Sequence, residues 1–114
     1  MAELHVRGDR LVLELSLTER VLGLEGRDIS VPLAAVSSAR VVRPARDAIR
    51  GIRAPGTGFP GVIALGHWRA RGRHDFVAVY GRHAGVVVEL AGQRFDRLVV
   101  SVDDPEAVVT EIRA

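Results

Sequence analysis

The chain has 114 residues and a formal net charge of +2, from sixteen basic and fourteen acidic residues. This length fits a single domain, residues 1–114, which buries enough apolar surface to fold without covalent crosslinks. The absence of cysteine excludes disulfides, thiolate catalysis and cysteine-based zinc sites. Because the N-terminus also lacks the apolar core of a signal peptide and no apolar run is long enough to span a bilayer, we expect a cytoplasmic protein.

Charge is distributed unevenly along the chain. All sixteen basic residues are arginine, and lysine and asparagine are both absent, which is typical of a high-GC bacterial genome. Residues 40–82 hold nine arginines and two acids, a net +7, whereas the remainder holds seven arginines and twelve acids, a net −5. Such a distribution attracts either an anion or a second copy of the same protein.

The first third of the chain predicts a hairpin, a short helix and two strands. Apolar and polar residues alternate on both sides of Gly8-Asp9, which indicates a β-hairpin. Ser16 and Glu19 form an S-x-x-E capping box ahead of apolar residues at helical spacing, so a helix of at most two turns follows. Residues 29–31 and 36–42 are the next predicted strands.

Residues 44–61 form the longest predicted irregular stretch, with three prolines and four glycines and one helical turn near Ala48 and Ile49. Irregular segments of this length are usually functional or disordered, and the sequence leaves open which applies. Strands are expected at residues 62–68, 76–80, 86–90 and 95–102, separated by short turns. This spacing is typical of a meander that closes into a barrel or a two-sheet sandwich.

The chain ends in a predicted helix. Asp103 or Asp104 caps it, Pro105 lies in its first turn, and the stripe of Val108, Val109 and Ile112 must dock on the sheet because so short a helix is unstable alone. The predicted fold class is therefore mainly β, a barrel or sandwich of about seven strands, with a short helix after the first hairpin and a C-terminal capping helix.

The closing segment FDRLVVSVDDPEAVVTEI resembles the last strand and closing helix of bacterial PH-like (pleckstrin-homology superfold) domains. The segments PLAAVSSARVV and GTGFPG are similar to those of small actinobacterial proteins of this group. The resemblance implies a seven-stranded barrel-like sandwich plugged by the terminal helix. It does not carry over a phosphoinositide site, because the first hairpin loop here includes Asp9 among its arginines.

Two sets of residues are candidate binding positions. Arginine forks and glycine-exposed backbone N–H groups bind anions, so the arginine-rich 43–61 loop predicts an anion cradle formed by Arg43, Arg46, Arg50, Arg53, Gly56 and Gly58. The competing interpretation is a solvated arginine-rich loop, or one paired with acids of a neighbouring subunit. Gly56 to Gly61 also match G-x-G-x-x-G, but a strand rather than a helix follows, which favours a tight turn over a dinucleotide site.

The second set is a candidate interface at the end of a strand, Trp68 and Arg69, where the tryptophan anchors either the protein's own core or a partner. His67 must face the opposite side of the sheet from Trp68. The spacing of His67, His74 and His83 matches no familiar metal-ligand pattern, and loop histidines are usually solvated. No metal, cofactor or catalytic residue is assigned, and no nucleic-acid partner or membrane insertion is expected.

The sequence thus predicts a non-catalytic interaction or assembly module that self-associates through sheet edges or its charge-asymmetric surfaces. One alternative is a binding domain for an anionic small molecule or headgroup at the 43–61 loop. Another is a small barrel enzyme, which would require several ionisable side chains converging in one pocket.

Overall fold

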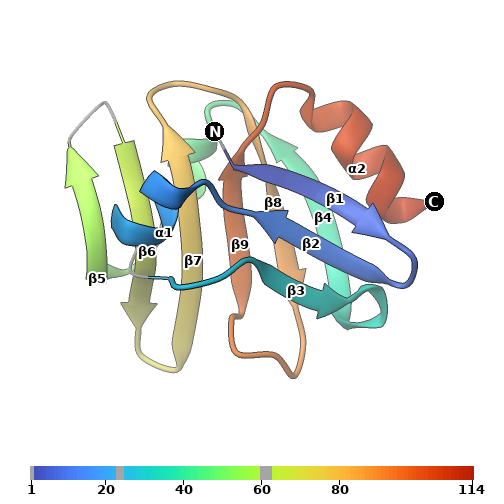
Figure 1. The fold of residues 1–114 in the computed structure, drawn as a ribbon, viewed down its shortest axis with the longest axis horizontal. Coiled ribbons are helices and arrows are strands. Elements are labelled where there is room, and N and C mark those ends of the chain that lie inside the picture. The colour runs from blue at the N-terminus through green and yellow to red at the C-terminus, as the bar shows by residue number, and fades with distance from the viewer. Residues whose placement is uncertain (1, 23–24, 60–62) are drawn as a thin grey trace.

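The computed structural model describes residues 2–22, 25–59 and 63–114, and for residue 22 and residues 52–59 it describes the backbone. Two sheets face each other as a sandwich, with no closed barrel (Figure 1). The smaller sheet has the order β1-β2-β3, formed by Glu3–Arg7, Arg10–Glu14 and Ile29–Pro32. The helix α1, Leu17–Leu22, lies between β2 and β3 in the chain.

The larger sheet has the strand order β4-β8-β9-β7-β6-β5. Its strands are Val36–Val42, Ile52–Phe59, Ile63–Ala70, Arg73–Tyr80, Gly85–Leu90 and Arg97–Ser101, numbered β4 to β9 along the chain. Two 3₁₀ turns, η1 (Leu33–Ala35) and η2 (Ala45–Ala48), flank β4, and the helix α2 (Pro105–Arg113) ends the chain. Among the described residues no helix is both long and apolar enough to cross a membrane.

The described strands of the larger sheet do not form a simple meander. β9 lies between β8 and β7, antiparallel to β8 and parallel to β7. The sequence predicted neighbouring strands in chain order, and that prediction is wrong at two places. β7 and β8 are consecutive in the chain but not paired, and β4 and β5 lie at opposite edges of the larger sheet. Local periodicity indicates where strands form, whereas the choice of neighbour depends on contacts between distant segments.

A second correction concerns the segment expected to be irregular. Residues 52–59 form β5, which pairs antiparallel with β6 and is the edge strand of the larger sheet. The register shifts between Arg53 and Gly56, so a bulge accommodates Pro55, which has no N–H for the ladder. Pairing with β6 overrides the weak strand propensity of glycine and proline, and the described chain has nine strands rather than about seven.

The main core lies between the two sheets, and a smaller apolar cluster lies on the outer face of the larger sheet. α2 contacts β1, β4 and β8, and so closes the sandwich at the β4 side (Figure 1). Its predicted cap is confirmed, because the Asp104 carboxylate accepts a hydrogen bond from the Ala107 N–H at 3.1 Å. The largest fully buried apolar side chains are Phe76, Leu11, Leu13, Leu65, Leu98 and seven valines of β7, β8 and β9, among others.

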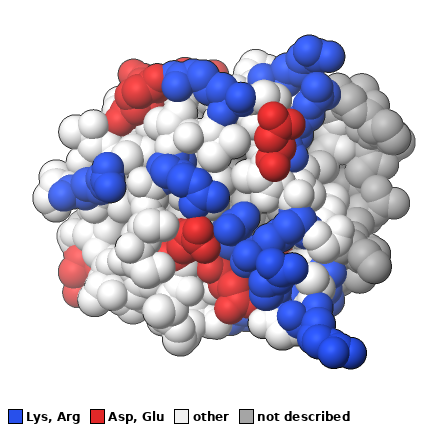
Figure 2. Space-filling model, turned by 180° about the vertical axis from the view of Figure 1, so that it is seen from behind, with Lys and Arg blue, Asp and Glu red and all other residues white. Residues whose placement is uncertain are grey.

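The outer-face cluster is covered by η2. It consists of Ala45, Trp68, Val77, Val79, Val87 and Val99. Arginines and acids are interspersed over the rest of this face (Figure 2). Gly85 is what allows η2 to approach β8, because a Cβ at this position would lie 2.2 Å from the Val100 carbonyl oxygen and 2.7 Å from the Ala45 Cβ.

Candidate functional site

The arginines predicted to form an anion cradle do not form one free cluster among the described residues. Arg43 is paired with Glu106 of α2. Arg50 donates two hydrogen bonds to Asp75, at 2.6 and 3.0 Å. Arg46 is partly exposed on η2. Arg53, Gly56 and Gly58 lie in β5, and their side-chain environment is outside the described residues.

The Arg50–Asp75 contact is a partly buried ion pair, in which the carboxylate is the buried member. The side chain of Asp75 is 2% exposed and that of Arg50 is 24% exposed. The hydrogen bond to Asp75 raises the pKa of Arg50 above its ordinary value, which outweighs the opposing effect of burial. An arginine held in this way compensates a buried carboxylate, so its guanidinium is already engaged within the chain.

Further charges of alternating sign continue across the same face. Glu89 of β8 accepts a hydrogen bond from Arg40 at 2.9 Å and lies 3.4 Å from a guanidinium nitrogen of Arg97 on β9. Burial would raise the pKa of Glu89, but the hydrogen bond from Arg40 and the charge of Arg97 lower it overall. These contacts join the neighbouring strands β4, β8 and β9.

The two candidate interface residues, Trp68 and Arg69, lie in different environments. Trp68 is 8% exposed and packs in the outer-face cluster, so it anchors the protein's own core, the first of the two roles that the sequence left open. Arg69 is exposed. The prediction that His67 and Trp68 face opposite sides of the sheet is confirmed, since the His67 ring contacts Phe76 and Phe95 in the main core.

Ionisable groups gather on the core face of β6 and β7. His67 is 3% exposed, and its Nδ1 lies 2.7 Å from Nε2 of His74. Its Nε2 lies 3.9 Å from the buried carboxylate of Glu25, which also pairs with Arg94 at 2.8 Å. The turn predicted to hold a solvated His74 is instead the start of β7. Burial is the main reason that the pKa of His74 is below its ordinary value, aided by the positive charge of Arg69.

This cluster borders a pocket of about 380 Å³ whose lining includes Glu25, Ile29, Val31, Arg94 and Phe95. The pocket is therefore lined by both apolar and charged side chains, and its buried carboxylate, Glu25, is paired with Arg94. The arrangement can exchange a proton between neighbouring imidazoles, which is an element of acid–base chemistry. His83 does not take part, because it is exposed in the turn after β7.

An acidic groove lies between β1 and α2. It has a volume of about 520 Å³, within the range of ligand pockets. No arginine lines it, and four carboxylic acids do: Glu3, Asp103, Asp104 and Glu111. Two of these acids also have structural roles, since Asp104 caps α2 and Glu111 accepts a hydrogen bond from the Val6 N–H at 2.6 Å.

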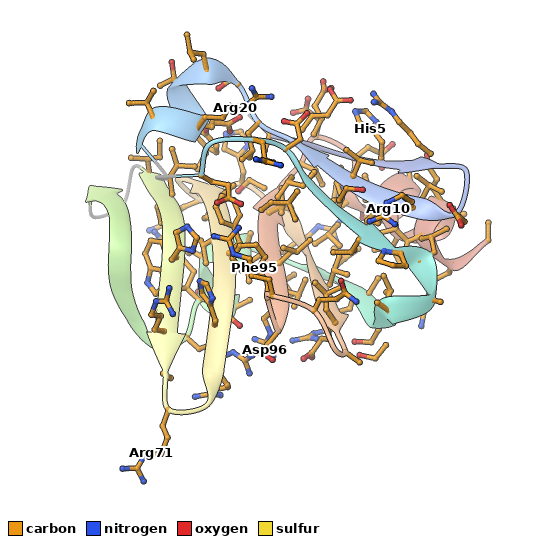
Figure 3. All side chains as sticks on the ribbon, turned by 60° about the horizontal axis from the view of Figure 1, so that its bottom comes forward. His5, Arg10, Arg20, Arg71, Phe95 and Asp96 are labelled. Carbon is orange, nitrogen blue, oxygen red and sulfur yellow. The ribbon has the colours of Figure 1, made fainter. Side chains whose placement is uncertain are left out.

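The opposite charge protrudes at the far end of the molecule. The β6–β7 turn is Ala70-Arg71-Gly72-Arg73, in which Gly72 has a positive φ of 70°. Arg71 and Arg73 are exposed, and Arg71 extends away from the body of the protein (Figure 3). Neither arginine makes an ion pair with any residue that the structure describes. We call Arg71 and Arg73 the arginine tip.

Sequence reasoning found the charge asymmetry but not these two surfaces. It placed the important arginines in residues 43–53, because they precede a glycine-rich segment, whereas the arginine tip lies in a plain hairpin turn. The acids of the groove come from both ends of the chain and meet only because α2 packs against β1. Comparison of the chain with protein-family models, curated proteins and solved structures gave no match.

Proposed function

We propose that the protein is a non-catalytic interaction module that self-associates by docking the arginine tip of one copy into the acidic groove of another. The observation that carries this proposal is the separation of opposite charge between two ends of the molecule. Four acids line a groove at one end of the molecule, and two arginines without ion pairs among the described residues protrude at the other. A cleft lined by charge of one sign concentrates its field and attracts the opposite charge.

The placement of the two surfaces determines the type of contact. The β6–β7 turn lies at the end of the molecule opposite α2 (Figure 1). Because Arg71 extends away from the body of the protein (Figure 3), we propose that copies meet end to end, which makes the contact heterologous, head to tail. Each added copy presents a new groove and a new tip, so assembly continues past the dimer unless the rotation closes a ring. A side-by-side antiparallel pair would instead satisfy both contacts about a two-fold axis and stop at the dimer.

Because the charges are exposed, the association depends on salt. Exposed ion pairs contribute only about 0–1 kcal/mol each and are screened over about 10 Å at 0.1 M ionic strength. We expect species larger than a dimer at low salt and high protein concentration, and monomers in 0.5 M sodium chloride. Light scattering coupled to size-exclusion chromatography measures both states.

The charge-reversed tip variant Arg71→Glu/Arg73→Glu tests the contact. We expect it to stay monomeric at low salt. The control is Arg27→Glu/Arg82→Glu, which makes the same change in net charge at two other exposed arginines and should associate like the native chain. A native protein that is monomeric at every concentration in low salt would overturn the proposal.

A mixing experiment tests whether complementary charge changes restore association. Asp103 is exposed in the groove, and Asp103→Arg should accept the glutamates of the reversed tip. Mixing Asp103→Arg with Arg71→Glu/Arg73→Glu should therefore restore complexes that neither variant forms as readily alone. Equal association of the mixture and of the separate variants would contradict direct contact between tip and groove.

We also propose that the chain is related to PH-like domains. The support is a series of short strands that ends in one amphipathic helix packed against the sheets, preceded by the acidic capping turn Asp103-Asp104-Pro105. The anion-binding alternative has less support, because Arg43 and Arg50 are engaged by acids of the same chain.

A further inference from the structure

The outward face of the β1–β2 hairpin gathers three metal-ligating side chains, of which Glu3 is also an acid of the groove. The two-residue turn Gly8-Asp9 sets the register, with Arg7 opposite Arg10 and Glu3 opposite Glu14. His5 is two residues from Glu3 and therefore on the same face of the strand. Figure 3 shows His5 on this hairpin, and its ring nitrogen Nε2 is directed at both carboxylates.

The distances fit a small metal ion. Nε2 of His5 lies 3.2 Å from Oε2 of Glu3 and 3.7 Å from Oε1 of Glu14. The three ligand atoms all lie within 4.8 Å of one another. Zinc bonds to nitrogen and oxygen are about 2.0–2.2 Å long, which places ligand atoms about 3.4 Å apart on a tetrahedron. The three side chains thus need only small adjustments to share one ion.

The register also creates a charge problem that a cation relieves. Like charges directly opposite each other on antiparallel strands are destabilising, and Glu3 and Glu14 form such a pair. Arg7 pairs with Glu14, but the polar partner of Glu3 on this face is the His5 imidazole. A divalent ion between the three groups would neutralise both carboxylates at once.

We propose that Glu3, His5 and Glu14 bind a divalent first-row transition-metal ion such as Zn²⁺. The imidazole favours zinc, copper or nickel over calcium and magnesium, which prefer oxygen ligands alone. Three protein ligands leave the fourth position of a tetrahedral ion for water or for a group of a partner. Glu3 and His5 also line the acidic groove, so the ion would lie at its edge.

Metal titration of the full chain tests this site. Isothermal calorimetry with Zn²⁺ should show one ion per chain, and Ca²⁺ should show no measurable binding. His5→Ala and Glu3→Gln should each weaken zinc binding at least tenfold. Arg7→Gln should tighten it several-fold, because Arg7 competes with the ion for Glu14. His83→Ala, which removes an exposed histidine elsewhere, is the matched control and should bind like the native chain.

Three results would overturn the inference. They are a native chain that does not bind Zn²⁺ at millimolar concentration, a His5→Ala variant that binds it undiminished, and a loss of binding in His74→Ala but not in His5→Ala. The last result would assign the ion to the His67–His74 pair. Circular dichroism of each variant confirms that the fold is retained. Stoichiometry per chain is independent of whether copies associate, so this test and that of the arginine tip fail separately.

Discussion

The arginines of the protein differ in how much they contribute to its stability, and the difference depends on whether their partner is buried. Arg50 neutralises a carboxylate that is 2% exposed, whereas the exposed arginines of the tip make no ion pair with any described residue. An isolated buried charge is far more costly than an unpaired exposed one. Charge reversal at Arg50 is therefore unsuitable as a test of anion binding, because loss of binding would accompany loss of the fold.

We expect Arg50→Ala to lower the free energy of unfolding by about 3 kcal/mol, since it leaves Asp75 buried without its partner. Urea denaturation followed by circular dichroism measures the loss. Arg46→Ala, on the neighbouring 3₁₀ turn, should cost about 0.5 kcal/mol or less. The double variant Arg50→Met/Asp75→Leu removes both charges and should recover most of the stability. If it is no more stable than Arg50→Ala, the pair does not behave as described.

His74 makes stability depend on pH. Its pKa is lowered in the folded state, mainly by burial, so the unfolded chain binds the proton more readily. The sign follows from linkage: this stabilisation is fully present above the ordinary histidine pKa of about 6.5 and is lost as the pH falls through the folded value. Native unfolding midpoints in urea should therefore decrease below about pH 6.5.

The variant His74→Gln should show a shallower decrease over this range, while the exposed control His83→Gln keeps the native slope. Glu89 and Asp28, whose pKa values are also lowered, contribute their own losses only in the more acidic range where carboxylates titrate. Identical slopes for His74→Gln and the native chain would show that His74 is not the group responsible.

Among the elements, η2 depends on a single glycine. Gly85→Ala would place a methyl group against the Val100 carbonyl oxygen and Ala45, both parts of the packed structure. We expect a loss of about 3 kcal/mol, the upper end for overpacking. The control is Gly26→Ala, where an added Cβ meets nothing within 4 Å and stability should change by at most about 0.5 kcal/mol.

Thermal unfolding followed by the fluorescence of Trp68 measures both variants. This tryptophan, the only one in the chain, lies in the cluster that η2 covers. If Gly85→Ala melts at the native temperature, the 3₁₀ turn is free to move away and does not constrain the sheet.

The elements that could be predicted are those specified by short, local sequence patterns. The capping box is confirmed, because the Glu19 N–H donates to Ser16 Oγ at 3.2 Å and the Ser16 N–H donates to Glu19 Oε1 at 2.8 Å. The sequence also predicted β4 at the observed residues, 36–42, because its strand signal is likewise local. β5 was missed because its glycines and Pro55 indicate a loop, and its pairing with β6 is a tertiary contact.

The second role of Glu19 could not be predicted from local signals. Its other oxygen accepts a hydrogen bond from the Tyr80 hydroxyl at 2.5 Å, across sixty residues of chain. The acidic groove and the hairpin metal ligands differ in this respect. The groove needed the packing of α2 on β1, whereas the pairing of Glu3 with Glu14 follows from the length of the Gly8-Asp9 turn and was open to prediction.

At the scale of the whole molecule, the larger sheet is completed by β9. β4 and β8 lie on one side of it and β7, β6 and β5 on the other, so the two halves are paired only through β9. We expect a fragment of residues 1–92 to lack cooperative unfolding, because its central strand is missing. Adding a peptide of residues 93–114 should restore the native circular dichroism spectrum.

A peptide in which Val99 is replaced by Asp is the control for that experiment. Val99 is fully buried in the outer-face cluster, and an unpaired charge there should prevent reconstitution. Cooperative unfolding of the 1–92 fragment alone would show that β7 and β8 can pair directly.

The exposed turn between β6 and β7 also has a consequence for proteolysis. Trypsin cleaves after arginine, and Arg71 protrudes at a hairpin tip, where protease access is greatest (Figure 3). A single cut there leaves β6 and β7 paired to each other and to their other neighbours, so the nicked protein should remain folded. A tip buried in the groove of another copy would be shielded, and resistance to trypsin at low salt would then reveal assembly in crude extracts without purification.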